Sequence, residues 1–558
     1  MSPSIAFVGA GPTTLYTLSA FLKSMTGPAE VTIYEEQGRA GLGMPYRPGW
    51  NDPAMLSNIA SVEIPEIGET LIEWLRGLPR ARLVRLGIDP DGIDDHAFYP
   101  RLALGEYFLD KFTSLVNQSE DQGVVIDIAT RCRVMDISAS SKGLSLHVAP
   151  AGETPFERSF DHVVLATGHQ WPEEPEVKPG FFASPWPASA LKRIGPTTVA
   201  IRGSSLTAID AAVALATAHG SFIETDGAVI DYRISPGAEA FKIVMMSRKG
   251  LLPEADFFHP LPYAPLQICT PDAMAQLIKT ARGDLLEQAF ALFKTELMQA
   301  DPAYADQVGL GGLTLDDFAD HYFEARSASD PFDWAATNLA EARANYENQV
   351  TVGWRYAILR MHEVIALIVP HLSPDDLDRF NRDLKPIFVD EYATVPHLSI
   401  ERLLALRRSG HLDVMALGDT YSLDTSAPEP GATVVVDATR LRFPVLIDAT
   451  GQRPLAIDAF PFATLVKQGV VRDAAEGDPD GPRGIAVDAN FHPSSKHDAA
   501  NRIYCLSIPF ILDRHPFIQG ITSSHEMGEI VGADLAERSS REDVSPAQLA
   551  RSDADLVG

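Results

Sequence analysis

The sequence predicts an α/β protein in which two Rossmann-like, three-layer dinucleotide-binding domains are nested, with a helical insertion. Two observations predict the nested domains: near residue 5 and again near residue 198, a short apolar strand runs into a glycine-containing turn and then a helix. A third observation, apolar residues at helical spacing between residues 275 and 406, predicts the insertion. The expected boundaries are 1–190 with 430–558 for the first domain, 191–262 with 385–429 for the second, and 263–384 for the insertion.

The first glycine-containing turn has the residue types that a bound pyrophosphate requires. Gly9 allows the tight turn, and Gly11 lets the backbone approach the phosphates at the N-terminus of the next helix. Thr14 replaces the third glycine of the fingerprint, which predicts a slightly wider approach of helix and strand. Glu35 ends the next strand, roughly 20 positions on, where a carboxylate accepts hydrogen bonds from ribose hydroxyls. The alternative is a strand–turn–helix unit with incidental glycines. The residues expected at this nucleotide are Gly9, Gly11, Pro12, Thr13, Thr14, Glu35 and Glu36.

The second turn is a weaker fingerprint with a different ending. A strand over residues 198–201 leads into a turn that contains one glycine. The strand expected over residues 243–246 ends in a hydroxyl and two cations, which suit a 2′-phosphate and therefore favour NADPH over NADH. The alternative is a basic surface loop. The residues between 219 and 240 look like an insertion before this strand. The residues expected at this nucleotide are Gly203, Ser204, Ser205, Arg248 and Lys249.

Two further segments favour FAD at the first turn, which lies at the N-terminus as in flavoproteins with two dinucleotide folds. Residues 161–168 and 446–451 each form a strand that ends in Ala-Thr-Gly. Two such segments around an inserted region predict a flavin domain that is interrupted by a second nucleotide domain. Thr167, Gly168 and Gly451 are therefore expected at the cofactor.

Composition excludes several other classes. The chain has 46 basic and 75 acidic residues, a net charge of −29, so nucleic acid and membrane surfaces are poor partners. Its three cysteines form no CxxC motif and its histidines match no standard ligand set, so no metal is expected. Residues 1–22 carry no charge, but they lack the basic start of a signal peptide. The expected location is the cytoplasm.

Three more motifs carry a resemblance: residues 41–47 (GLGMPYR), 55–58 (MLSN) and 516–522 (PFIQGIT). With the first turn and the two Ala-Thr-Gly strands, the chain resembles the FAD/NAD(P)-binding proteins related to flavin-dependent N-hydroxylating, class B monooxygenases. The resemblance implies that residues 41–47 run beside the flavin and that a late helix, expected from Ser523, points its N-terminus at the flavin. It adds to the cofactor contacts Gly43, Met44, Tyr46, Arg47, Asn58, Gln519, Gly520 and Thr522, of which Asn58, Arg47 and Gln519 are assigned catalytic roles. The alternative for Arg47 is an ordinary surface arginine.

The function that follows is an FAD- and NADPH-dependent monooxygenase acting on the nitrogen of a small amine or amino acid, aspartate-like substrates included. Its oxidant would be a flavin C4a-hydroperoxide formed with O₂, so no catalytic triad is needed. Arg355, Arg360 and Arg514 are candidate anchors for a substrate carboxylate, although each alone is more typical of a structural ion pair. Two rival functions stay open: an FAD-dependent NAD(P)H oxidoreductase that inserts no oxygen, and a non-catalytic nucleotide-binding sensor. A homo-oligomer is compatible with the sequence.

Overall fold

The computed structural model describes residues 2–542, apart from residues 142, 226, 476 and 479–480. The chain divides into two compact units, each built from several stretches of sequence. The first unit comprises Met1–Pro48, Ile59–Gln170 and Gln452–Gly558. The second unit comprises Gly49–Asn58 and Trp171–Gly451.

The first unit is organised around a five-stranded parallel sheet. Its strand order is β19-β7-β1-β2-β3, and its middle strands are apolar because both faces of the sheet are covered. In the register, Val8 is opposite both Tyr34 and Leu165, so the residues that follow these three strands meet at one edge. The strands are β1 (Ser4–Val8), β2 (Ala29–Glu35), β3 (Val124–Thr130), β7 (His162–Leu165) and β19 (Ile503–Cys505).

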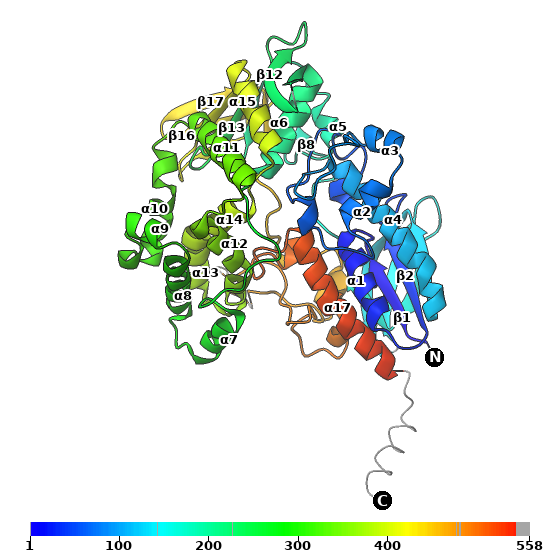
Figure 1. The fold of residues 1–558 in the computed structure, drawn as a ribbon. Helices are drawn as coiled ribbons and strands as arrows, with labels where there is room; N and C mark the ends of the chain where they lie inside the picture. Colours follow the sequence, from blue (N-terminus) through cyan, green and yellow to red (C-terminus); the bar gives the residue numbers. More distant parts are fainter. Residues whose placement is uncertain (1, 142, 226, 476, 479–480, 543–558) are drawn as a thin grey trace, which may run out of the picture. The chain divides into compact units, whose positions relative to one another are not determined.

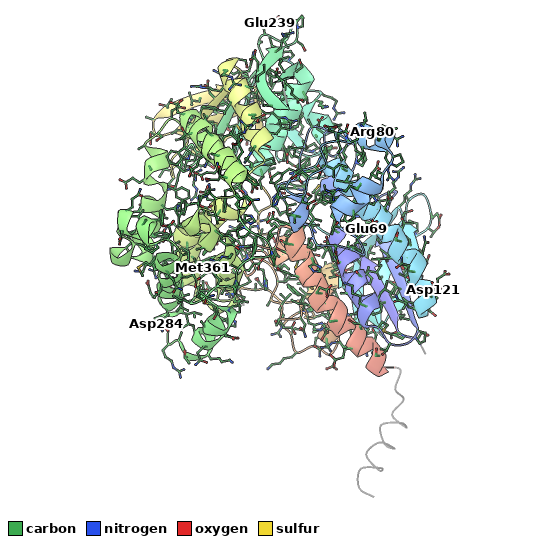
Figure 2. The ribbon with its side chains drawn as sticks, viewed as in Figure 1. Glu69, Arg80, Asp121, Glu239, Asp284 and Met361 are labelled. Atoms are coloured by element: carbon green, nitrogen blue, oxygen red, sulfur yellow. The ribbon has the colours of Figure 1, made fainter. Side chains whose placement is uncertain are left out.

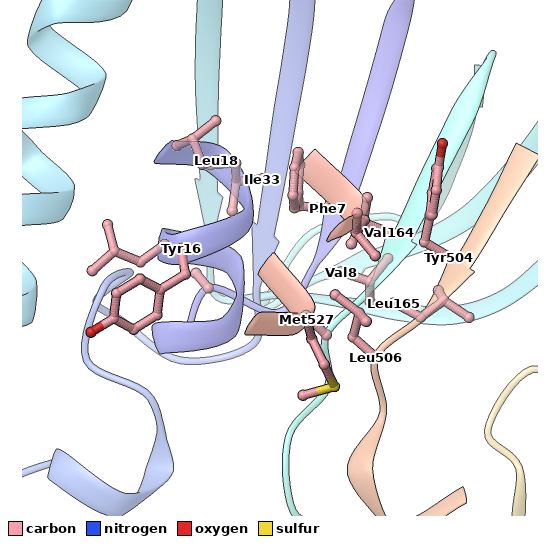
Figure 3. Close-up of a cluster of buried hydrophobic side chains, with 14 of the residues drawn as sticks. Phe7, Val8, Tyr16, Leu18, Ile33, Val164, Leu165, Tyr504, Leu506 and Met527 are labelled. Carbon is pink, nitrogen blue, oxygen red and sulfur yellow. The ribbon is translucent and has the colours of Figure 1, made fainter. Parts of the chain in front are cut away.

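Two helices from opposite ends of the chain pack together in this unit. Helix α17 (Ile521–Glu542) lies along α1 (Pro12–Ser24), and side chains of both helices join the core that covers the sheet, Tyr16 and Met527 among them (Figures 1 and 3). A Cβ on Gly532 would lie 2.6 Å from the Cβ of Ala20, so this glycine permits the close approach. The unit also contains α2 (Leu71–Gly77), α3 (Arg80–Arg85), α4 (Arg101–Ser119), α16 (Ala463–Lys467) and an antiparallel sheet of β4 (Cys132–Ser140), β5 (Gly143–Pro150) and β6 (Phe156–Phe160).

The second unit contains a six-stranded sheet with the order β14-β13-β10-β18-β9-β8. All neighbours are parallel except β8 and β9. The strands are β8 (Glu176–Lys178), β9 (Phe181–Phe182), β10 (Thr198–Arg202), β13 (Lys242–Ser247), β14 (Leu412–Ala416) and β18 (Val445–Asp448), with helices α5 (Ala188–Leu191) and α6 (Leu206–His219). The insertion expected before β13 is an antiparallel hairpin of β11 (Gly220–Thr225) and β12 (Ala228–Ile234).

The middle of the chain is helical, as the periodicity predicts. Met361 on α12, which is labelled in Figure 2, is fully buried, as an inward position of such a pattern should be. The helices are α7 (Pro271–Thr280), α8 (Leu285–Ala300), α9 (Pro302–Gln307), α10 (Leu315–Ser327), α11 (Pro331–Asn348), α12 (Gly353–Ala366), α13 (Pro374–Arg379), α14 (Lys385–Tyr392) and α15 (His397–Arg408). The fold class is therefore confirmed: two parallel, Rossmann-like sheets and a helical insertion. No helix among the described residues is long and apolar enough to cross a membrane.

One group of strands lies elsewhere than the sequence predicts. The sequence assigns residues 430–558 to the domain that contains the chain's N-terminus. The structure places β18, which precedes the second Ala-Thr-Gly segment, directly beside β10 in the second unit's sheet. The antiparallel strands before it, β15 (Ser422–Asp424), β16 (Ala432–Val436) and β17 (Thr439–Phe443), belong to the same unit. Hydrogen bonding along β10, which the sequence pattern does not reveal, decides this placement.

Candidate nucleotide-binding sites

The turn after β1 has room for glycine alone at its first position. Gly9 has a φ of +100°, and a Cβ built on it would lie 2.2 Å from the carbonyl oxygen of Ala166. The N–H of Gly9 donates to the carbonyl of Tyr34, and the N–H of Ala166 donates to the carbonyl of Val8, both at 2.9 Å. The neighbouring strands β2 and β7 therefore hold this turn from both sides.

The predicted pyrophosphate residues gather at the N-terminus of α1. Gly11 is the N-cap residue of this helix and makes no side-chain cap bond. A Cβ on Gly43 would lie 2.6 Å from Cδ of Pro12, so residues 41–47 pack against the turn. The Thr13 hydroxyl donates to Ser524 on α17 at 3.2 Å, and the Thr14 hydroxyl donates to the carbonyl of Gly9 at 2.6 Å. Because helix N-termini carry free N–H groups and a positive dipole end, this cluster is a suitable place for an anion.

Glu35 lies buried at the end of β2, at the same edge of the sheet. Its carboxylate accepts hydrogen bonds from the N–H groups of Ala10 at 3.2 Å and Gln37 at 2.8 Å, and it lies 3.9 Å from the Arg47 guanidinium. Burial raises the pKa of Glu35, and the two N–H donors and Arg47 oppose that shift. Glu36 instead is exposed and pairs with Arg133 at 3.7 Å. The structure thus brings Arg47 to the carboxylate expected at the ribose.

The first Ala-Thr-Gly segment follows β7 at the same edge of the sheet. The hydroxyls of Thr167 and Ser507 lie 2.8 Å apart, and Gly168 has a φ of +68°. Burial lowers the pKa of His169 to about 4, and a hydrogen bond with Gln452 opposes that shift. The imidazole is therefore neutral at pH 7 and adds no positive charge to the carboxyl edge of the sheet, where ligands bind in such folds.

The turn after β10 repeats this construction in the second unit. Gly203 has a φ of +126°, and a Cβ on it would lie 2.5 Å from the carbonyl oxygen of Ala449. Its N–H donates to Met246 at 2.7 Å, and the N–H of Ala449 donates to Arg202 at 2.8 Å. The second Ala-Thr-Gly segment, which ends in Gly451, therefore packs against this turn in the same way as the first segment packs against Gly9.

The remaining residues of the second turn differ in what holds their side chains. The Ser204 hydroxyl donates to the carbonyl of Leu251 at 2.6 Å, whereas Ser205 is the N-cap residue of α6 and makes no side-chain cap bond. After β13, the carbonyl of Arg248 accepts from Gly418 at 3.0 Å. The Arg248 and Lys249 side chains are exposed beyond that point. The cations predicted for a 2′-phosphate lie on a turn with a fixed backbone.

The other predicted site residues are divided between the units. Gln519 and Gly520 are exposed just before α17, with Thr522 in its first turn; the helix begins at Ile521 rather than Ser523. Asn58 is exposed at the end of the segment that is grouped with the second unit. Met44 and Tyr46 form a single helical turn, and the Tyr46 ring packs on Phe108. The catalytic roles of Asn58, Arg47 and Gln519 stay predictions.

Two of the candidate substrate anchors have structural partners. Arg355 is buried and pairs with Glu254 and Glu391, both at 2.9 Å. Arg360 donates to the carbonyl of Ala264 at 2.7 Å. Within the described part of the chain, no group of three His, Cys, Asp or Glu side chains is arranged to hold a metal ion.

Two parallel sheets, each with a glycine turn at its carboxyl edge, define a protein with two dinucleotide folds. Residues 6–170 match the FAD-NAD(P)-binding family, and residues 270–392 match the YdhS-like middle domain. The chain is 39% identical over 537 residues to the uncharacterized protein YdhS of Escherichia coli (strain K12), covering 96% of this chain and 98% of that protein. The chain therefore belongs to the YdhS family.

Solved structures share the fold at low sequence identity. The ornithine N-hydroxylase of Kutzneria sp. 744 has a TM-score of 0.51 at 13% identity, covering 97% of this chain and 100% of that one. The cadaverine monooxygenase DfoA of Erwinia amylovora, solved with FAD, has a TM-score of 0.51 at 12% identity, covering 97% of this chain and 96% of that one. The ornithine hydroxylase PvdA of Pseudomonas aeruginosa has a TM-score of 0.50 at 12% identity, covering 96% and 99%. At these identities the likeness establishes the fold.

Sequence reasoning missed three parts of these sites. Ala166 and Ala449 close the two turns, and the repeated Ala-Thr-Gly motif was the signal that could have assigned one to each fold. Ser507, which bonds Thr167, lies in no recognisable motif. The contacts that the helical middle makes with Lys249 come from residues far away in the sequence.

Proposed function

We propose that this protein is an FAD- and NADPH-dependent monooxygenase that oxygenates the nitrogen of a small amine or amino acid. The observation that carries the proposal is the pair of turns at Gly9 and Gly203, built alike but followed by a buried carboxylate in one unit and by exposed cations in the other. A carboxylate suits the free ribose of FAD, and cations suit the 2′-phosphate of NADPH. The fold shared with amine hydroxylases supports the reaction class.

The residues of the first unit fit FAD. Gly11 and Gly43 pack closely at the start of α1, where the helix N-terminus suits a pyrophosphate. The Ala10 and Gln37 N–H groups hold the Glu35 carboxylate in a fixed orientation for two ribose hydroxyls. FAD, when bound, supplies the chemistry: it takes a hydride from NADPH and activates O₂. The protein's own part is to bind and orient the nucleotides and to keep water from the reacting groups. No side-chain nucleophile is required.

The purified full-length protein tests this proposal in one assay. Its absorbance spectrum should show a flavin, and NADPH consumption should rise with an amine or amino acid that yields a hydroxylamine or nitroso product. Flavin with NADPH oxidation, reduction of another acceptor and no oxygenated product would replace the monooxygenase with an oxidoreductase. Flavin without turnover would favour a sensor, and a protein that binds no flavin would contradict the whole scheme.

A further inference from the structure

The helical middle contacts the segment that follows β13. This segment, Arg248–Ala255, is here called the reading loop, because it begins with the two cations expected at the 2′-phosphate. Three residues of α10 at three-residue spacing, Asp320, Phe323 and Arg326, lie along it. Since residues three apart share one face of a helix, a single face of α10 follows the reading loop.

The first two of these residues hold Lys249. The Asp320 carboxylate lies 3.7 Å from the Lys249 ammonium, and the ammonium lies 5.0 Å from the centre of the Phe323 ring. Asp320 is 86% exposed and the Lys249 side chain is 44% exposed, so water screens this ion pair. In contrast, no carboxylate among the residues that the structure describes pairs with the Arg248 guanidinium.

The rest of the reading loop is fixed by buried groups of α10 and α11. Arg326 donates to the carbonyl of Leu252 at 2.8 Å. The Glu254 carboxylate accepts from Trp334 at 2.9 Å and from Asn338 at 3.2 Å. Buried charged groups that have hydrogen-bond partners rigidify their surroundings, so these contacts hold the loop against α10 and α11. The ion pair between Lys249 and Asp320, in contrast, is exposed to solvent, so an anionic ligand can replace Asp320.

We propose that α10 of the middle domain determines how strongly the protein prefers a 2′-phosphorylated coenzyme. Phe323 holds the Lys249 ammonium beside the 2′-phosphate position, while Asp320 competes with the phosphate for that ammonium. Arg248 meets the phosphate directly, and Lys249 adds to its binding only after it leaves Asp320. This inference rests on the proposed NADPH site, and it makes Phe323 and Asp320 positioning residues of that site.

Binding of 2′,5′-ADP and of ADP to the full-length protein, measured by calorimetry, tests the inference without any need for turnover. Asp320→Asn should tighten 2′,5′-ADP binding about threefold, the size expected for an exposed ion pair, and leave ADP binding unchanged. Phe323→Leu should weaken 2′,5′-ADP binding about threefold, as expected when a cation–π contact is lost. Glu324→Gln, which removes the same charge one turn further along α10, should change neither.

A double-mutant cycle separates a contact from a general charge effect. In a Lys249→Ala background, Asp320→Asn should no longer alter 2′,5′-ADP binding. If the wild type prefers 2′,5′-ADP and Asp320→Asn changes nothing, or changes both ligands equally, the inference is overturned while the proposed coenzyme survives. If the wild type binds both ligands equally, or neither, the proposed NADPH site fails as well.

Discussion

The turns at Gly9 and Gly203 share a backbone and differ in charge. In each, the glycine N–H bonds to the neighbouring strand, and the missing Cβ leaves room for the carbonyl of an Ala-Thr-Gly segment on the other side. At the end of the second strand, however, the first fold has the buried Glu35 and the second has the exposed Arg248 and Lys249.

This comparison separates two kinds of requirement. The common parts, a glycine with positive φ and a neighbouring strand held against it, are what any dinucleotide turn needs. The parts that differ lie where the adenosine ribose is expected, and we propose that they distinguish a free diol from a phosphate. In this proposal one kind of turn binds two cofactors, and a few side chains determine which cofactor each turn binds.

The largest effect should come from replacing the first glycine of each turn by alanine, in two separate variants. Gly9→Ala should weaken FAD binding on the order of a hundredfold, because the Cβ forces a strained backbone against Ala166. Gly203→Ala should do the same to NADP⁺ binding and leave flavin content normal. Flavin content by absorbance and NADP⁺ binding by calorimetry measure both, and each variant is the other's control. Loss of both ligands in either variant would show that the turns are not independent sites.

The sequence predicted the two glycine turns and their strands better than the distant residues that contact them. Gly9, Glu35, Gly203 and the strands around them follow from local patterns, and the fold class follows from these. The assignment of both Ala-Thr-Gly segments to one flavin domain did not follow, because pairing of β18 with β10 depends on contacts between distant residues. For the same reason no pattern indicated that Asp320 contacts Lys249.

The next effect concerns the cations of the second fold. Arg248→Ala should raise the KM for NADPH roughly thirtyfold, the range for a lost hydrogen bond to a charged group, and barely change the KM for NADH. Steady-state kinetics with both coenzymes give the ratio. Arg248→Lys should recover part of the loss, because the charge returns without the bidentate geometry. Equal changes for both coenzymes would remove the 2′-phosphate role from this residue.

FAD binding to the first fold should depend on pH through the protonation of Glu35. Because burial raises the pKa of Glu35, it takes up a proton at a higher pH than an ordinary carboxyl, and a protonated carboxyl accepts fewer hydrogen bonds. FAD affinity should therefore fall as pH is lowered from 7 towards 5. Glu35→Gln should bind FAD about tenfold more weakly at pH 7 and lose this dependence. Parallel pH profiles for the variant and the wild type would contradict the assignment.

The last effect concerns the packing of α17 against α1, and it is measured as stability instead of ligand binding. Gly532→Ala places a Cβ 2.6 Å from that of Ala20, so α17 must move away from α1. We expect a loss of about 1–3 kcal/mol in unfolding free energy. Thermal and urea unfolding of the flavin-free protein measure it. Unchanged NADP⁺ binding is expected, and a loss of that binding would contradict the separation of the two sites.

We expect one nucleotide in each turn, and a crystal structure of the protein with FAD and NADP⁺ is the decisive experiment. The FAD pyrophosphate should lie against the backbone from Gly11 to Thr13, with its ribose on Glu35. The NADP⁺ pyrophosphate should lie at the start of α6, and the 2′-phosphate should lie within hydrogen-bond distance of Arg248. Exchanged positions, or a 2′-phosphate that contacts neither Arg248 nor Lys249, would contradict this expectation.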